Sequence, residues 1–296
     1  MAKNKTYHST ILTDADLKKP RYKLLYAILF SVMLIMALIS AIPVIWIMLS
    51  GFKDVKEMYS VPPSFLPKKI ELSKLLTAWK SMKFYKYYVN TFIMSGGAVL
   101  FSDIVCSMAG YSFSKLKPKG SKAIFMICFW IMLLPGTVRT VPLYMTIKDF
   151  PVFHFSMMNT YLPMWLFECS NIFRIILFKN FFDTISYSIF EAATVDGAGE
   201  LRIFLSIILP LSLPIYMVCS LFCFNNQFGQ FFWPYLTVSD PTKTVLGVQI
   251  FKMKESNYTL DYQMIALLFA IAPELIVYLI FQKQIIGGIN LGGVKG

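Results

Sequence analysis

The residues best suited to a specific interaction lie in one polar stretch, EAATVDGAGELRIFLSIILP, which runs from Glu191 to Pro210. Its Asp196-Gly197 dipeptide is typical of a turn, and Gly197 can adopt the left-handed conformation that ends many helices. Helical patterns flank this dipeptide, so the stretch predicts a helix, a sharp turn and a second helix. Ala192 is small enough to let another surface approach closely, and Phe190 adds apolar area beside it. The chemistry indicated is docking against another surface rather than catalysis.

The sequence contains no catalytic or metal-binding motif that we can identify. It has two histidines, His8 and His154, so neither an HExxH motif nor a histidine-rich cluster exists. Cys219 and Cys223 share a helical face, but no histidine or acid joins them, and packing is the better interpretation. The ending GGINLGGVKG lacks the spacing of a phosphate-binding loop. We therefore expect no metal site, and if the protein uses ATP, another chain binds it.

The elements that carry this stretch are expected to be membrane helices. Of the 296 residues, 56% are hydrophobic and only 15% are charged, whereas a soluble domain has about 25% charged residues. Six apolar runs approach or exceed the roughly 20 residues that a helical span needs, and they lack the alternation of barrel strands. We expect an all-α polytopic protein with six transmembrane helices near residues 24–50, 88–110, 123–145, 158–178, 205–224 and 263–283.

Charge gives a weak indication of orientation and argues against nucleic acid as a partner. The net charge is +12, but the lysines are spread over several loops and form no basic face with aromatic partners. Membrane lipid is the partner that this charge fits. Positive charge favours the cytoplasmic side of a membrane protein. The basic N-terminal tail, residues 1–23, and the acid-free segment from Lys115 to Lys122 therefore indicate that both termini are cytoplasmic. The eight lysines in 51–87 would then lie outside, which weakens this argument.

The docking stretch resembles the EAA signature of ATP-binding-cassette (ABC) importer permeases: E-A-A, three residues, G, nine residues, then I-x-L-P. The positions that match are Glu191, Ala192, Ala193, Gly197, Ile207, Leu209 and Pro210. Further segments are similar to the carbohydrate-uptake branch that includes maltose-type permeases: YYVNTF at 87–92, AGYSFSKLKPKG at 109–120, PLY at 142–144, FFWPY at 231–235 and the ending GGVKG. The resemblance covers nearly the whole chain.

This resemblance implies a function as well as a fold. Residues 24–286 would form the permease domain, and 188–204 would be a cytoplasmic coupling loop that docks into an ATPase subunit. Glu191 would offer charge-assisted hydrogen bonds to that subunit, the adjacent alanines close packing, and Gly197 the turn. The implied partners are a second permease, a pair of ATPases that carry ATP and magnesium, and an extracytoplasmic sugar-binding protein. The protein would lie in a bacterial cytoplasmic membrane, with both termini, including the tail at 287–296, on the cytoplasmic side.

Four ionisable residues fall inside the apolar runs: Asp103, Glu168, Arg174 and Glu274. A charge at the bilayer centre costs about 2.5–3.5 kcal/mol or more, so each should face protein or water. Asp103 and Arg174 lie at similar predicted depths, and we expect them to form an intramembrane ion pair. Glu168 and Glu274 lie nearer the middle and are candidates to line a translocation path.

Aromatic faces and amide or hydroxyl groups are what a sugar path requires. The residues that offer them, together with Glu168, are Trp165, Asn171, Tyr161 and Tyr144. Trp and Tyr also populate membrane interfaces in general, so aromatic content alone does not identify a path.

One alternative from another class is a proton- or sodium-driven secondary transporter, in which Glu168, Glu274 and Asp103 would form the ion relay. Such folds usually show internal repeats. No repeat relates the first three runs to the last three, and this alternative leaves the Glu191–Pro210 stretch without a role.

Overall fold

The computed structural model describes residues 20–62, 64–256 and 258–292, and within these ranges it contains helices and no strand. The expected N-terminal tail therefore lies almost entirely outside the described residues, as do the last four residues. The longer helices are α1 (Pro20–Ser50), α3 (Leu72–Ser81), α4 (Phe84–Tyr111), α5 (Ser121–Met132), α6 (Gly136–Lys148), α7 (Leu162–Cys169), α8 (Ile172–Thr184), α9 (Tyr187–Val195), α12 (Leu213–Phe228), α14 (Leu246–Met253) and α15 (Leu260–Gly292). The short elements are α2 (Val55–Met58), η2 (Ser112–Leu116), α10 (Glu200–Ile203), η3 (Phe204–Ile208), α11 (Leu209–Leu211), α13 (Phe232–Thr237) and η4 (Pro241–Lys243).

The predicted spans differ in how closely the helices follow them. Among the described residues, three helices are long and apolar enough to cross a membrane: α1, α4 extended through η2, and α15. Two bent pairs, α5 with α6 and α10–α11 with α12, raise the number to as many as five if each counts as one span. The fourth predicted span, 158–178, is divided between α7 and α8. The helical class is thus confirmed, whereas a count of six spans stays a prediction.

Proline and polar residues account for the breaks. The axes of α5 and α6 meet at 104°, where Pro135 caps α6. The α10–α11 segment and α12 meet at 80° around Ser212, which lies between Pro210 and Pro214. Proline has no amide hydrogen and its ring clashes with the preceding turn, so a helix bends or ends there. Between α7 and α8, Asn171 starts the new helix by accepting a hydrogen bond from the amide of Arg174, at 3.3 Å.

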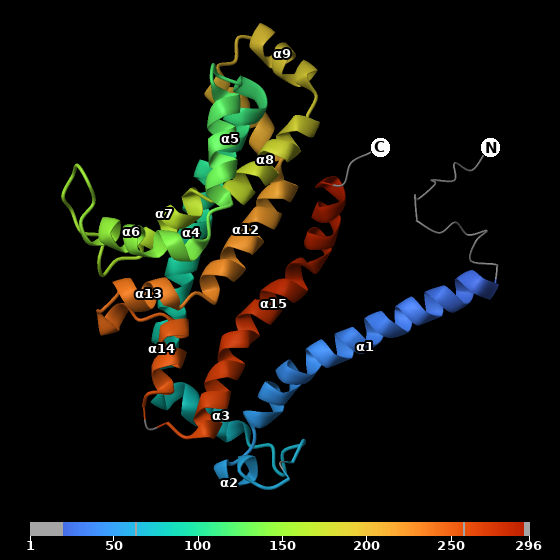
Figure 1. The fold of residues 1–296 in the computed structure, drawn as a ribbon, viewed down its shortest axis with the longest axis vertical. Coiled ribbons are helices and arrows are strands. Elements are labelled where there is room, and N and C mark those ends of the chain that lie inside the picture. Colours follow the sequence, from blue (N-terminus) through green and yellow to red (C-terminus); the bar gives the residue numbers. More distant parts are fainter. Residues whose placement is uncertain (1–19, 63, 257, 293–296) are drawn as a thin grey trace.

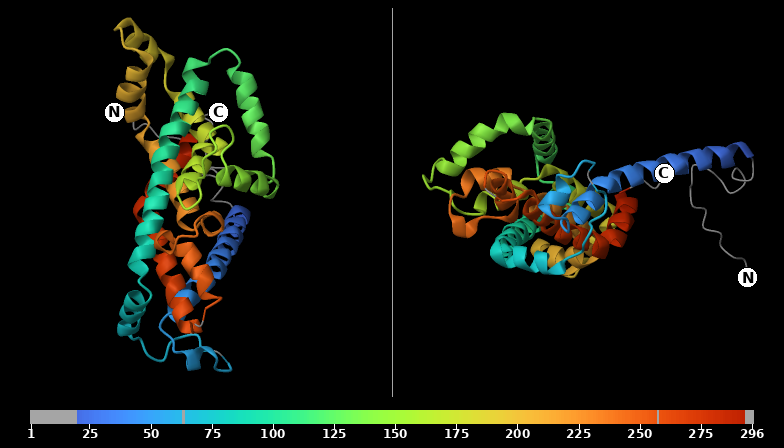
Figure 2. Two further views of the ribbon diagram at one scale, coloured as in Figure 1. Left: turned by 90° about the vertical axis from the view of Figure 1, so that its left-hand side faces the viewer. Right: turned by 90° about the horizontal axis from the view of Figure 1, so that it is seen from below.

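Helix α4 is the central element of the bundle. It packs against α7, α8 and α12, and α12 packs in turn against α15 (Figures 1 and 2). Helix α1 diverges from the bundle and approaches it near α15 (Figure 1). None of the most apolar window of α1 is buried within the chain. An apolar surface of this length needs lipid or another membrane helix to cover it.

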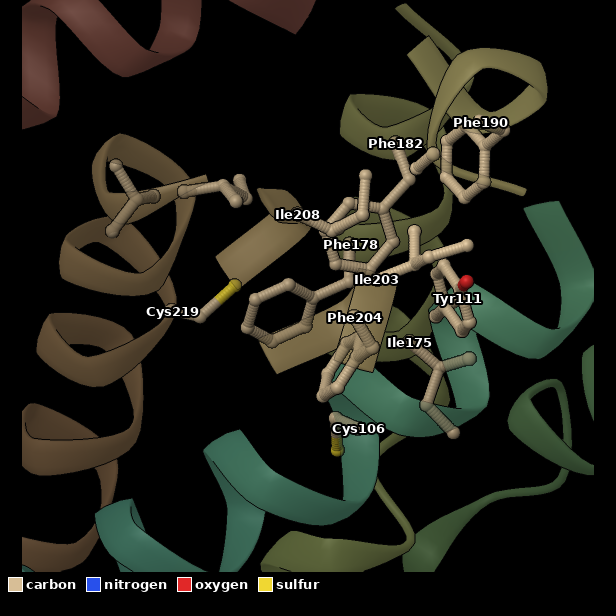
Figure 3. Close-up of a cluster of buried hydrophobic side chains, with 13 residues drawn as sticks. Cys106, Tyr111, Ile175, Phe178, Phe182, Phe190, Ile203, Phe204, Ile208 and Cys219 are labelled. Carbon is tan, nitrogen blue, oxygen red and sulfur yellow. The ribbon is translucent and has the colours of Figure 1, made fainter. Parts of the chain in front are cut away.

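Two packed regions lie at opposite ends of the bundle. At the end that carries α9, a cluster of buried aromatic and aliphatic side chains joins α4, α8, η3 and α12 (Figure 3). At the end that carries α2 and α3, Lys74 of α3 forms an ion pair with Asp261 of α15 at 2.8 Å. An ion pair therefore links α3 to α15 at one end of the bundle, and α9 projects from the opposite end (Figure 1).

Candidate functional site

The Glu191–Pro210 stretch forms the expected helix, turn and helix. Ser186 caps α9, since its hydroxyl accepts a hydrogen bond from the amide of Ser188 at 3.4 Å. The helix ends at Asp196, and Gly197 follows with φ of +78°, which glycine adopts without strain. Glu200 then opens α10. The three short segments α10, η3 and α11 lead from the turn to the bend at Ser212 and into α12, a helix of the bundle.

The side chains of α9 divide into an inner and an outer face, which corrects part of the expected docking set. Phe190 and Ala193 are buried within the chain, and Phe190 stacks on Tyr111 of α4 with ring centroids 5.9 Å apart (Figure 3). Their spacing of three residues puts both on the face that packs against the bundle. Glu191 and Ala192 are exposed. Phe190 and Ala193 therefore hold α9 in place and are not available to another chain in this conformation.

Polar contacts from α4 and η2 hold the segment 185–200, which overlaps the predicted coupling loop at residues 188–204, called the coupling loop below. The hydroxyl of Tyr111 donates to a carboxylate oxygen of Glu200 at 3.1 Å. Lys115 in η2 donates to the backbone oxygen of Ile185 at 2.6 Å, and its ammonium lies 5.1 Å from the ring centre of Phe190. Sequence reasoning missed these anchoring residues, although Tyr111 and Lys115 fall within the matched segment at 109–120.

The later residues of the motif lie in the connection to α12. Ile207 and Leu209 are half-buried and Pro210 is exposed. Ile208, between the first two, is completely buried in the cluster of Figure 3. Pro210 stands two residues before the bend at Ser212, so its position shapes the connection. Asp196 and Gly197 are both exposed at the turn.

A second polar site lies inside the bundle and differs from expectation. Arg174 forms its ion pair with Glu168, not with Asp103, and both partners are nearly inaccessible to solvent. Asp103 instead accepts a hydrogen bond from Ser220 of α12 at 2.5 Å. The reason is the break between α7 and α8. Residues six apart would lie about 240° around a continuous helix, but the break lets Glu168 and Arg174 meet.

Further groups complete this buried polar site. Ser102 of α4 accepts from Arg174 Nη1 at 2.9 Å. The side-chain amides of Asn226 and Gln227 each donate to Glu168 Oε1 at 2.6 Å. Sequence reasoning missed these partners, although the amide run Asn225-Asn226-Gln227 inside an apolar segment was a visible signal. The buried polar site ties α4, α7, α8 and α12 together.

The expected substrate-path residues have most of their polar atoms engaged within the chain. Trp165 donates its indole N–H to the backbone oxygen of Met94 at 3.0 Å, and its ring stacks on Phe101. Tyr161 donates to the backbone oxygen of Lys243 at 2.7 Å. Asn171 caps α8 and Glu168 is buried in its ion pair, so Glu168 does not line an open path in this conformation. Tyr144 is half-buried on α6. Their role in a path stays a prediction.

Fold and site together define a polytopic α-helical membrane protein with a helix–turn–helix anchored at one end of its bundle. A family model described as "Binding-protein-dependent transport system inner membrane component" matches residues 105–289, which include the whole Glu191–Pro210 stretch. The chain therefore belongs to this family of transport permeases, and the resemblance drawn from the EAA motif is confirmed.

Individual relatives extend the match over most of the chain. The melibiose/raffinose/stachyose import permease protein MelC of Bacillus subtilis is 30% identical over 246 residues, which cover 78% of this chain and 83% of MelC. The diacetylchitobiose uptake system permease protein NgcG of Streptomyces coelicolor is 26% identical over 271 residues, covering 90% and 88% of the two chains. Among solved structures, a chain of a bacterial ABC transporter involved in the import of the acidic polysaccharide alginate has a TM-score of 0.75 at 24% identity. The match covers 90% of this chain and 98% of that one. At 24% identity, the similarity to the alginate transporter supports the fold of this chain alone.

Proposed function

We propose that this chain is one of two transmembrane subunits of an ATP-driven importer that moves a sugar or oligosaccharide into a bacterial cell. The single observation that carries the proposal is the coupling loop: α9 is fixed to the bundle through Phe190 and Ala193 and leaves Glu191 and Ala192 exposed. A loop anchored on one face and open on the other is suited to receive force from a second protein.

The coupling loop connects to the bundle at both of its ends. On one side, Ile185 and Ser186 lead from α8 into α9; on the other, α10 to α11 lead into α12. Displacement of α9 by an ATPase would therefore move α8 and α12 together, because Glu168 at the end of α7 links Arg174 of α8 to Asn226 and Gln227 of α12. This is a rigid-body route between inward-open and outward-open states.

The substrate class rests on the relatives. MelC and NgcG are named for the import or uptake of oligosaccharides, and we extend sugar transport to this chain from them. A partner permease, two ATPase subunits that bind ATP and magnesium, and an extracytoplasmic sugar-binding protein complete the proposed assembly. This chain would then hydrolyse nothing itself and hold no cofactor of its own.

The coupling loop also gives the proposed orientation. An ATPase acts from the cytoplasm, so the end of the bundle that carries α9 would be cytoplasmic and the end that carries α2 and α3 would face outward. Helix α15 runs from the α3 end toward the α9 end, and α1 also leads away from the α3 end toward the N-terminus (Figure 1). Both termini would accordingly be cytoplasmic.

The ion-driven alternative is less well supported by the buried polar site. Glu168 is paired with Arg174 and accepts two amide hydrogen bonds, and Asp103 is bound by Ser220. A relay residue has to exchange protons or ions with water, whereas Glu168 is nearly inaccessible to solvent. We therefore do not assign Glu168 and Asp103 to ion coupling.

The proposal is tested by purifying a tagged chain in mild detergent from its native host and identifying every chain that co-elutes. We expect a second permease and an ATPase, with ATP hydrolysis that rises when a sugar-loaded binding protein is added. A chain that elutes alone and moves solute under an ion gradient would overturn the proposal.

A further inference from the structure

A cavity lies beside the coupling loop, at the same end of the bundle, between η2, α5 and α8. Its volume is about 710 Å³, within the range of roughly 300–1,000 Å³ that small-ligand sites occupy. The residues that line it are Phe113, Lys117, Pro118, Gly120, Ser121, Lys122, Phe125, Lys179 and Asp183. Nothing in the transport mechanism proposed above uses this cavity.

The charges that line the cavity favour an anion. Three lysines face one acid, Asp183, and that acid is already engaged: Ser114 donates to one of its oxygens and Lys179 to the other, each at 2.6 Å. Lys117 and Lys122 are exposed, and neither is paired with an acid in the described part of the chain. Two ammonium groups are therefore free to bind an anionic ligand.

The apolar part of the cavity favours an anion that carries hydrocarbon. Phe113 and Phe125 meet edge to face with ring centroids 5.3 Å apart. Helix α5 leads away from there without a buried residue, and Ile124 and Ile127 on it are about half exposed. A free phosphate would use the lysines alone and leave this adjoining apolar surface uncovered.

We propose that this cavity binds the headgroup of an anionic phospholipid, with its acyl chains along α5. The inference rests on the proposed function in one respect, which is that it places this end of the bundle at the cytoplasmic leaflet. That leaflet is rich in anionic lipid, and basic pockets between membrane helices on this side are suited to such headgroups. Lys117 and Lys122 bind the phosphate, and the two phenylalanines contact the first carbons below it. Lipid at this position would brace α5 against α8, the helix that leads into the coupling loop.

Native mass spectrometry of the purified full chain in neutral detergent, titrated with dioleoylphosphatidylglycerol, tests this site. Each lysine near an anionic surface contributes about fivefold in affinity, so Lys122→Gln should weaken binding about fivefold and Lys117→Gln with Lys122→Gln about 30-fold. The matched control is Lys119→Gln, which makes the same charge change in the same loop at a residue that does not line the cavity. We expect it to change affinity less than twofold.

Three results would overturn the assignment. Equal losses for the Lys119 and Lys122 variants would show a general charge effect, and equal binding of dioleoylphosphatidylcholine would show that the anion is not recognised. Displacement of the lipid by an equal concentration of glycerol phosphate would show a site for a free phosphate. The measurement uses the chain without its ATPase. Its failure is therefore distinct from failure of the importer proposal, which is judged by the chains that co-elute.

Discussion

Arg174 forms a buried ion pair with Glu168 across the break between α7 and α8. Both side chains are almost fully enclosed, and hydrogen bonds from α12 and to α4 complete their surroundings. A buried ion pair contributes little net stability compared with a well-packed apolar pair, but breaking it leaves a buried charge without a partner. The pair therefore ties α7 to α8 across the break.

Removing one partner of the Glu168–Arg174 ion pair should destabilise the chain more than removing both. We expect Arg174→Met to destabilise the chain by about 3–5 kcal/mol, because the Glu168 carboxylate would stay buried without its counter-charge. The double variant Glu168→Gln with Arg174→Met should recover most of that loss. The measurement is the midpoint of thermal unfolding in detergent. Equal midpoints for the single and double variants would show that the pair is not coupled.

Two glycines of α4 should respond in opposite ways to alanine. A Cβ at Gly110 would lie 2.7 Å from Phe178 Cβ and 2.9 Å from the backbone nitrogen of Lys179, so Gly110→Ala should push α4 away from α8. A Cβ at Gly96 would meet nothing within 4 Å, and there alanine should be neutral or stabilise the helix by up to about 1 kcal/mol. Thermal unfolding of both variants tests this. Equal effects would mean that α4 and α8 do not pack this closely.

The contact between η2 and α8 should weaken only in acid. Burial raises the pKa of the Asp183 carboxyl, but hydrogen bonds from Lys179 and Ser114 and the nearby lysine charges outweigh burial, so its pKa lies below 3.8. The stabilisation is therefore fully present above the unfolded-state pKa of about 3.9 and is lost as the pH falls through the folded-state value. Asp183→Asn should lower the unfolding midpoint at pH 7, and the difference from the parent chain should begin to shrink below about pH 4 and vanish once the pH lies below the folded-state pKa. A difference that is constant with pH would contradict this.

The turn of the coupling loop should not tolerate proline at Gly197. The φ of Gly197 is +78°, far from the value of about −65° that proline requires, and its amide donates to Thr194 at 3.0 Å. Gly197→Pro should leave membrane insertion intact and reduce ATPase attachment severalfold. The control is Gly199→Pro, where φ is already −73°. Co-purification of the ATPase with each variant is the readout, and equal recovery with both would show that the turn geometry is irrelevant.

The sequence predicted the helical class, the helix, turn and helix of the Glu191–Pro210 stretch, and the two spans at 24–50 and 88–110, because each depends on local pattern. The prediction of 24–50 corresponds to α1 at Pro20–Ser50, and that of 88–110 to α4 at Phe84–Tyr111. The break at Ser170-Asn171 was not predicted, because average hydropathy over a whole span hides two polar residues. The sixth helix also continues to Gly292, past the expected boundary at 286.

Partner choice inside the bundle was beyond sequence reasoning. Equal depth made Asp103 a reasonable partner for Arg174, but depth does not fix the rotation of a helix about its axis. The same limit applies to α9, where the motif includes Phe190 and Ala193 near Glu191 and does not distinguish the face that packs inward from the face that stays open.

The most direct test of the account is the amount of ATPase recovered per tagged chain when Glu191 is changed to lysine. A hydrogen bond to a charged group is worth about 1.5–3 kcal/mol, so recovery should fall about tenfold or more. Glu255→Lys makes the same charge change at an exposed turn after α14 and should change recovery less than twofold. Equal membrane levels of both variants would show that insertion is intact. Full recovery of the ATPase with Glu191→Lys would contradict the assignment of this loop as the coupling element.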